Sequence, residues 1–210
     1  MAVRALSTLL RFAFGLLAIA AIVVQIQSLM AADAFRPGRF FAYFTIQSNL
    51  LGAAVLIEAV LRRGQVTPLL DGFRGAATVY LIVTFFVVLA LLSEVDVQLA
   101  VPWVDLVLHK VMPVVLVLDW IQYPPHARIE VSRAIFWLVF PLLWLVFTLL
   151  RGAISGWYPY PFLDPAVSGY VGVILSCIAV TAGLVVVGFL VFMTGNVMRL
   201  RMARHRSDLR

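Results

Sequence analysis

The chain has 210 residues, of which 63% are hydrophobic and 12% are charged, and its mean hydropathy is +1.04. A soluble domain has about 45–50% apolar and about 25% charged residues, so this composition excludes an ordinary soluble enzyme. The net charge is +6, which in a soluble protein would favour nucleic-acid binding. Here the positive charge lies between and after apolar stretches, as topology signals do, and we expect no nucleic-acid partner.

Six apolar stretches follow one another along the chain. A spanning helix needs roughly 20 mainly apolar residues, and backbone amides in lipid must be bonded within the segment. The first stretch is longer than the core of a signal peptide, so we expect it to be retained. The sequence therefore predicts an all-α polytopic membrane protein in which one membrane domain, residues 1–210, has spans at 12–30, 41–61, 75–92, 102–121, 134–150 and 168–194 and a basic tail at 195–210.

Lys and Arg residues are distributed unevenly between the two sets of connecting segments. Twelve of the 16 lie in the N-terminal segment, the loops after the second and fourth spans, and the tail; three lie in the opposite set. Cytoplasmic segments are enriched in Lys and Arg, so a multi-pass protein of the cell membrane with both termini in the cytoplasm is predicted. The twelve are Arg4, Arg11, Arg62, Arg63, Arg74, Arg128, Arg133, Arg199, Arg201, Arg204, Arg206 and Arg210, and the three are Arg36, Arg39 and Arg151.

With this orientation, polar residues inside the spans gather in the outer half of the membrane. At a rise of 1.5 Å per residue, Thr45 lies about 6 Å and His109 about 10 Å inside the outer end of its span. Glu58 and Asp119 lie near the cytoplasmic ends, where we expect them to reach water. Ionisable groups in lipid are costly, so the outer group is where function is expected.

The second span carries Thr45, Ser48 and Asn49 on one helical face, by the i, i+3, i+4 rule. Such residues often bond to backbone carbonyls or hold membrane helices together, which is one interpretation. The other is that they line a functional site.

The fourth span contains Asp105 and His109 four residues apart on one face, with Lys110 next to the histidine. An aspartate in this position orients the ring and stabilises its cationic form. Pro113 removes the amide that would bond the His109 carbonyl, which opens the backbone there. A structural histidine and a catalytic one are both consistent with this pattern.

The segment after the fifth span contains Arg151 and the aromatic and proline-rich stretch from Trp157 to Pro165. Its Trp and Tyr residues suit the membrane interface. The second interpretation is a lid over the outer polar group, in which Arg151 pairs with a carboxylate or phosphate.

Metal and cofactor motifs are absent from the sequence. Cys177 is the only cysteine, which excludes an internal disulfide and a cysteine-rich metal site. His126 and His205 lie outside the spans and are not spaced with His109 as a ligand set, and no glycine-rich phosphate loop occurs. We expect no metal and no cofactor.

Two short motifs resemble those of a known group. Phe44-Thr45-Ile46 in the second span, with His109-x-x-x-Pro113 in the fourth, resembles the androgen-induced family of multi-pass membrane proteins. Members of that family are intramembrane threonine hydrolases that cleave fatty acid esters of hydroxy fatty acids. The Trp157–Pro165 stretch is more similar to a bacterial six-helix family related to it.

The resemblance implies that Thr45 is the nucleophile and His109 its base. Asp105 would orient the histidine, and Lys110 or the Asn49 amide would stabilise the oxyanion. Arg151 and Trp157 would bind the substrate, a fatty acid ester or similar lipid ester that enters from the bilayer.

The competing class is a non-enzymatic multi-pass membrane protein, either a small carrier or a scaffold with a polar core. A carrier needs polar groups on both sides of the midplane, whereas those of this chain favour one side. Membrane lipids are expected partners in either case, and the oligomeric state is left open.

Overall fold

The computed structural model describes residues 2–62, 67–92 and 101–208, with side chains described for 5–62, 67–92 and 101–204. The predicted all-α fold is confirmed, because the described residues contain no strand. Two residues of the charge count, Arg63 and Arg210, lie outside the described residues, as do the side chains of Arg4 and Arg206. The helices are α1 (Ala2–Ala31), α2 (Pro37–Phe40), α3 (Phe44–Leu61), α4 (Pro68–Leu91), α5 (Pro102–Leu106), the π-helical η1 (Val107–Val111), α6 (Met112–Gln122), α7 (Val131–Ser155), the 3₁₀ helix η2 (Pro161–Leu163) and α8 (Pro165–Asp208).

Five helices within the described ranges are long and apolar enough to cross a membrane, namely α1, α3, α4, α7 and α8. The predicted span 102–121 is built differently. It consists of α5, η1 and α6 in direct succession, so a π-helical segment interrupts it. The chain therefore has the apolar helices of a multi-pass membrane protein, and one of the six predicted spans is a helix of mixed type.

The helix ends follow local sequence signals. Proline stands at the first position of α4, α5 and α8, where its missing N–H removes no helical hydrogen bond. Gly156 ends α7 in the left-handed conformation, with φ 68°, and its N–H bonds the Gly152 carbonyl. The chain then turns sharply into the Gly156–Asp164 loop.

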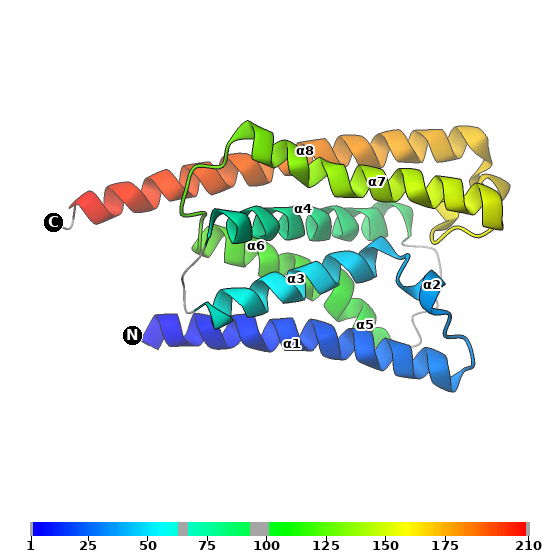
Figure 1. Ribbon diagram of the computed structural model, residues 1–210, viewed down its shortest axis with the longest axis horizontal. Coiled ribbons are helices and arrows are strands. Elements are labelled where there is room, and N and C mark those ends of the chain that lie inside the picture. Colours follow the sequence, from blue (N-terminus) through cyan, green and yellow to red (C-terminus); the bar gives the residue numbers. More distant parts are fainter. Residues whose placement is uncertain (1, 63–66, 93–100, 209–210) are drawn as a thin grey trace.

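Helix α4 is the centre of the bundle, with contacts to α3, α6, α7, α8 and η1. Figure 1 shows α1 and α3 on one side of it and α7 and α8 on the other. Both termini lie at one end, whereas α2 and the loop between α7 and α8 lie at the opposite end. We call these the terminal end and the loop end.

Small residues allow close approach at several crossings. A Cβ on Gly15 of α1 would lie 2.8 Å from Ile57 of α3, and one on Gly195 of α8 would lie 2.7 Å from the Trp120 ring. The Trp120 indole N–H also donates to the Val191 carbonyl of α8, which bonds α6 to α8. Membrane helices pack by van der Waals contact and interhelical hydrogen bonds, and these contacts are of that kind.

A buried ionic cluster joins three helices at the terminal end. Arg74 of α4 pairs with Asp71 at 2.9 Å and with Asp119 of α6 at 2.7 Å. Arg11 of α1 also pairs with Asp119, and its guanidinium lies over the Tyr123 ring. Two expectations were therefore wrong. Asp119 does not reach water, because two arginines surround it, and Arg74 is a buried helical residue rather than part of a loop.

The last helix is longer than predicted. Residues 195–208 were expected to form a tail after the sixth span, but they continue α8 as helix. Met, Arg, Leu and Ala are strong helix formers, and no proline follows Gly195, so the helix has no local reason to stop.

Candidate functional site

The structure brings Thr45 and His109 together at the loop end. Thr45 is the second residue of α3, and His109 is the middle residue of η1. His109 Nε2 lies 3.3 Å from Thr45 Oγ1, and both side chains are buried. The sequence resemblance required this proximity of residues from separate helices. The separation is at the long end for a hydrogen bond, as is common in sites without substrate.

Asp105 occupies the far side of the histidine ring. Its Oδ1 lies 2.7 Å from His109 Nδ1, and its side chain is 35% exposed. A carboxylate accepts, so Nδ1 carries the proton and Nε2 presents its lone pair to Thr45. This is the tautomer that a general base needs.

The π-helical segment leaves one backbone carbonyl without a backbone donor. The Met112 N–H bonds the Val107 carbonyl, five residues earlier, instead of that of Leu108. The next residue is Pro113, which has no N–H. The sequence indicated an open backbone at the His109 carbonyl, and the π register additionally frees the carbonyl of the preceding residue, Leu108.

Asn49 satisfies that carbonyl. Its Nδ2 donates to the Leu108 carbonyl at 3.0 Å and to the Thr45 carbonyl at 2.9 Å, which uses both amide hydrogens. The geometry therefore does not fit the predicted role of Asn49 as an oxyanion donor. Asn49 instead bonds α3 to η1, and this fixes the helix that carries Thr45 against the one that carries His109.

Tyr160, which the sequence analysis did not single out, is the third group beside the Thr45 hydroxyl. Its hydroxyl lies 3.3 Å from Thr45 Oγ1, and its oxygen accepts the Thr45 N–H at 3.3 Å. Burial raises the pKa of Tyr160 to about 12. Its ring packs against Tyr43, Trp144 and Phe162. In the sequence it looked like any aromatic residue of an interfacial loop.

A polar cavity of about 270 Å³ extends from this group towards the loop end. Thr45, His109 and Tyr160 line it together with Gln25, whose Oε1 is buried and has no hydrogen-bond partner in the described structure. Two arginines and several apolar and aromatic residues complete the lining, which also includes Leu29, Ala34, Arg36, Arg39, Phe40, Tyr43, Ile46, Leu92, Leu108 and Trp157.

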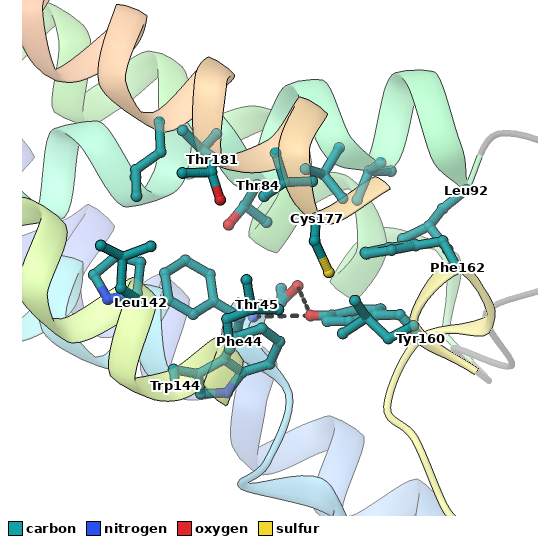
Figure 2. A pocket seen from close by; sticks show the side chains of 18 residues that line it. Phe44, Thr45, Thr84, Leu92, Leu142, Trp144, Tyr160, Phe162, Cys177 and Thr181 are labelled. Atoms are coloured by element: carbon teal, nitrogen blue, oxygen red, sulfur yellow. Dashed lines mark hydrogen bonds between the residues drawn. The ribbon is translucent and has the colours of Figure 1, made fainter. Parts of the chain in front are cut away.

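A second, apolar cavity of about 60 Å³ meets the same threonine from the other side. Figure 2 shows the Thr45 and Tyr160 oxygens turned towards each other, with Cys177 beside them and Thr84 and Thr181 further from Tyr160. Apolar side chains of α4, α7 and α8 form most of its wall. Thr45 and Tyr160 line both cavities, so the Thr45 hydroxyl lies where a polar and an apolar space meet.

The remaining predicted residues lie around the site rather than in it. Lys110 is exposed and does not line either cavity, so its predicted role at the oxyanion does not fit the geometry. Arg151 lines neither cavity, but its guanidinium lies 5.0 Å from the Trp157 ring, which Arg39 also approaches. Trp157 lines the polar cavity, as the interpretation of its loop as a lid requires.

The described residues contain no group of three or more His, Cys, Asp or Glu side chains able to hold a metal ion. Comparisons with protein-family models, with curated proteins and with solved structures give no match. The chemistry of the site is therefore argued from its own geometry.

Proposed function

We propose that the protein is an intramembrane hydrolase of lipid esters, with Thr45 as nucleophile and His109 as general base. The observation that carries this proposal is the hydrogen-bonded series Asp105–His109–Thr45, which ends at a buried hydroxyl between a polar and an apolar cavity. A threonine hydroxyl is a poor nucleophile until a base takes its proton, and the series supplies an oriented base. The resemblance to intramembrane threonine hydrolases supports the same roles.

The two cavities support a particular orientation of the ester. The first methylene groups of the acyl chain next to the carbonyl enter the apolar cavity, whose volume is about 60 Å³, and the alcohol part occupies the polar cavity. Arg36 and Arg39 line the polar cavity and favour an anionic group on the alcohol part. We therefore propose that Arg36 and Arg39, rather than Arg151, contact the anionic group of the substrate.

The reaction proceeds through an acyl-enzyme. Thr45 Oγ1 attacks the ester carbonyl while its proton passes to His109 Nε2. The carbon–oxygen bond of the ester breaks, and the alcohol leaves with that proton. Water, deprotonated by His109, then releases the fatty acid and restores the threonine.

The decisive experiment is covalent labelling with a fluorophosphonate probe in membranes, together with a lipid-ester hydrolysis assay. Wild type should label and hydrolyse, and Thr45→Ala and His109→Ala should each lose almost all turnover, because nucleophile and base act as a unit. Thr84→Ala is the matched control. Thr84 is also a buried threonine of the apolar cavity, but its hydroxyl bonds the Tyr80 carbonyl.

Two outcomes contradict the proposal. Labelling that persists in Thr45→Ala would remove Thr45 from the nucleophile role. Folded wild-type protein that neither labels nor hydrolyses would favour the non-enzymatic class, a carrier or scaffold with a polar core.

A further inference from the structure

We infer that Tyr160 is a further catalytic residue, whose hydroxyl donates a hydrogen bond to the oxyanion that forms when Thr45 attacks the ester. This inference rests on the hydrolase function proposed above and adds to it a residue that neither the motif resemblance nor the sequence pattern indicates. Its starting point is the position of the Tyr160 hydroxyl, 3.3 Å from the nucleophilic oxygen.

The hydrogen bonds around Thr45 fix the direction in which Tyr160 donates. Asp105 accepts from His109 Nδ1, so in the neutral ring His109 Nε2 is the acceptor, and Thr45 donates its hydroxyl proton to it. The Tyr160 oxygen accepts the Thr45 N–H. The Tyr160 hydroxyl proton is therefore donated to Thr45 Oγ1. The tyrosine is a donor to the nucleophile in the resting site.

The same proton is well placed when the reaction begins. As Oγ1 bonds to the carbonyl carbon, the lone pair that accepted from Tyr160 is withdrawn. The negative charge develops on the carbonyl oxygen, which is bonded to the same carbon and therefore lies next to Oγ1. A small rotation of the phenolic hydroxyl redirects its hydrogen bond from Oγ1 to the oxyanion. Donors that are aligned before the reaction stabilise such an oxyanion effectively.

Burial suits Tyr160 to this role. Its side chain is enclosed by aromatic rings, and its raised pKa of about 12 keeps it protonated where an ordinary tyrosine, with a pKa near 10, begins to ionise. The other donors considered do not reach the oxyanion. Asn49 has both hydrogens on backbone carbonyls, and Lys110 is exposed and lines neither cavity. Of the described residues that line both cavities, Tyr160 is the donor beside Thr45.

No covalent change occurs at the tyrosine. The Thr45 proton goes to His109 Nε2, the carbonyl π electrons move to the oxygen, and Tyr160 donates a hydrogen bond to that oxygen without transferring its proton. When the tetrahedral intermediate collapses, the electrons re-form the carbonyl bond, the leaving oxygen takes the proton from His109, and Tyr160 remains a neutral phenol.

The first test is Tyr160→Phe, which keeps the ring packing and removes the hydroxyl. Loss of one oxyanion donor typically lowers kcat by about 10²–10³-fold, and we expect a loss in this range with KM changed by less than about threefold. Tyr158→Phe is the control. Tyr158 belongs to the same loop, but its ring packs on Gly152 and it lines neither cavity, so its kcat should equal that of wild type.

The second test separates oxyanion stabilisation from a purely structural role, because Tyr160→Phe also leaves the Thr45 N–H without its acceptor. Each protein is assayed with an ester and with the matching thionoester, in which sulfur replaces the carbonyl oxygen. Sulfur is a weak acceptor, so wild type should lose much of its rate on the thionoester. Tyr160→Phe should show an oxygen-to-sulfur rate ratio at least tenfold smaller than that of wild type.

The outcomes distinguish the inference from the proposed function. Wild-type hydrolysis that depends on Thr45, with a Tyr160→Phe variant of normal kcat, would overturn the role of Tyr160 and leave the hydrolase intact. A lower kcat with an unchanged oxygen-to-sulfur ratio would also overturn it, because a structural defect slows both substrates equally. Absence of hydrolysis in wild type would overturn the hydrolase itself.

Discussion

Asp105 acts on the site through its hydrogen bond to Nδ1 of His109. Asp105→Asn should preserve the shape of the site but allow the wrong tautomer, in which Nε2 carries the proton and is no longer a base. In the Ser-His-Asp triad of serine proteases this change costs about 10⁴-fold in kcat. Asp105 is partly exposed, so water compensates in part, and we expect a loss of about 10²-fold or more.

Glu58→Gln provides the control for Asp105→Asn. Glu58 is a carboxylate near the opposite end of α3, where it pairs with Arg62, and its removal should leave kcat unchanged. Equal rates for wild type and Asp105→Asn, measured under saturating substrate, would show that the aspartate does not orient the base.

Arg39 should affect binding rather than chemistry. Arg39→Gln removes a positive charge from the polar cavity, and because Arg39 is exposed, its pairing with an anionic group is worth about 0.2–1 kcal/mol. KM for an ester with a carboxylate on its alcohol part should therefore rise about two- to fivefold, with kcat little changed. KM for a neutral ester of the same length should not change.

Arg151→Gln is the matched arginine variant for this experiment. Arg151 contacts Trp157 but does not line the cavity, so its KM effect should be smaller than that of Arg39→Gln. A larger KM increase for Arg151→Gln than for Arg39→Gln would show that Arg151 contacts the anionic group, as the sequence predicted.

At the scale of the elements, the loop that carries Tyr160 depends on one glycine of α7. A Cβ on Gly152 would lie 2.0 Å from the Tyr158 ring, so Gly152→Ala must displace that ring. Tyr158 lies two residues before Tyr160, so we expect the displacement to disturb Tyr160 and kcat to fall at least tenfold. Gly183→Ala of α8 is the control, since a Cβ there meets nothing within 4 Å and alanine favours a helix by about 0.8–1.0 kcal/mol over glycine.

Both glycine variants are compared by hydrolysis rate and by thermal unfolding in detergent. A Gly152→Ala protein with wild-type turnover would show that the loop conformation is not required for activity.

The spans were predictable from the sequence because the bilayer imposes a length and an apolar composition on each of them. The π-helical form of residues 107–111 was not predictable, because Pro113 indicates a missing backbone hydrogen bond without specifying the hydrogen-bond register of the helix. His109 could be singled out because an imidazole is rare in lipid, and Thr45 because it shares a helical face with Ser48 and Asn49 and belongs to the motif that resembles the threonine hydrolases. Tyr160 could not be found, because a tyrosine in an aromatic loop has many equally ordinary positions, and only the folded loop brings it to Thr45.

For the whole molecule, the predicted orientation is open to a direct test. Both termini lie at one end, and α2 lies at the other. In a Cys177→Ser background, Gly38→Cys should react with an impermeant maleimide in intact cells, whereas Ser207→Cys should react only after the membrane is permeabilised. The physical reason is the excess of arginine in the segments predicted to face the cytoplasm. Labelling of Ser207→Cys in intact cells would reverse the orientation.

The buried carboxylate, guanidinium and imidazole groups of the described bundle form two separate sets at opposite ends. The site occupies the loop end, and the cluster of Arg11, Arg74 and Asp119 occupies the terminal end. Fully buried apolar side chains, such as Leu81 and Met112, belong to the core between them. This arrangement favours a site open to one side of the membrane over a polar route from one side to the other.

The ionic cluster at the terminal end also bears on how the protein is made. Asp119 belongs to a helix that is synthesised later than α4, so Arg74 has to leave the ribosome and approach the bilayer before this partner exists. Asp71, one helical turn earlier, is already present and pairs with Arg74 within α4 itself. The third span thus enters the membrane with the Asp71–Arg74 ion pair already formed. Asp119 and Arg11 join this pair in the finished bundle.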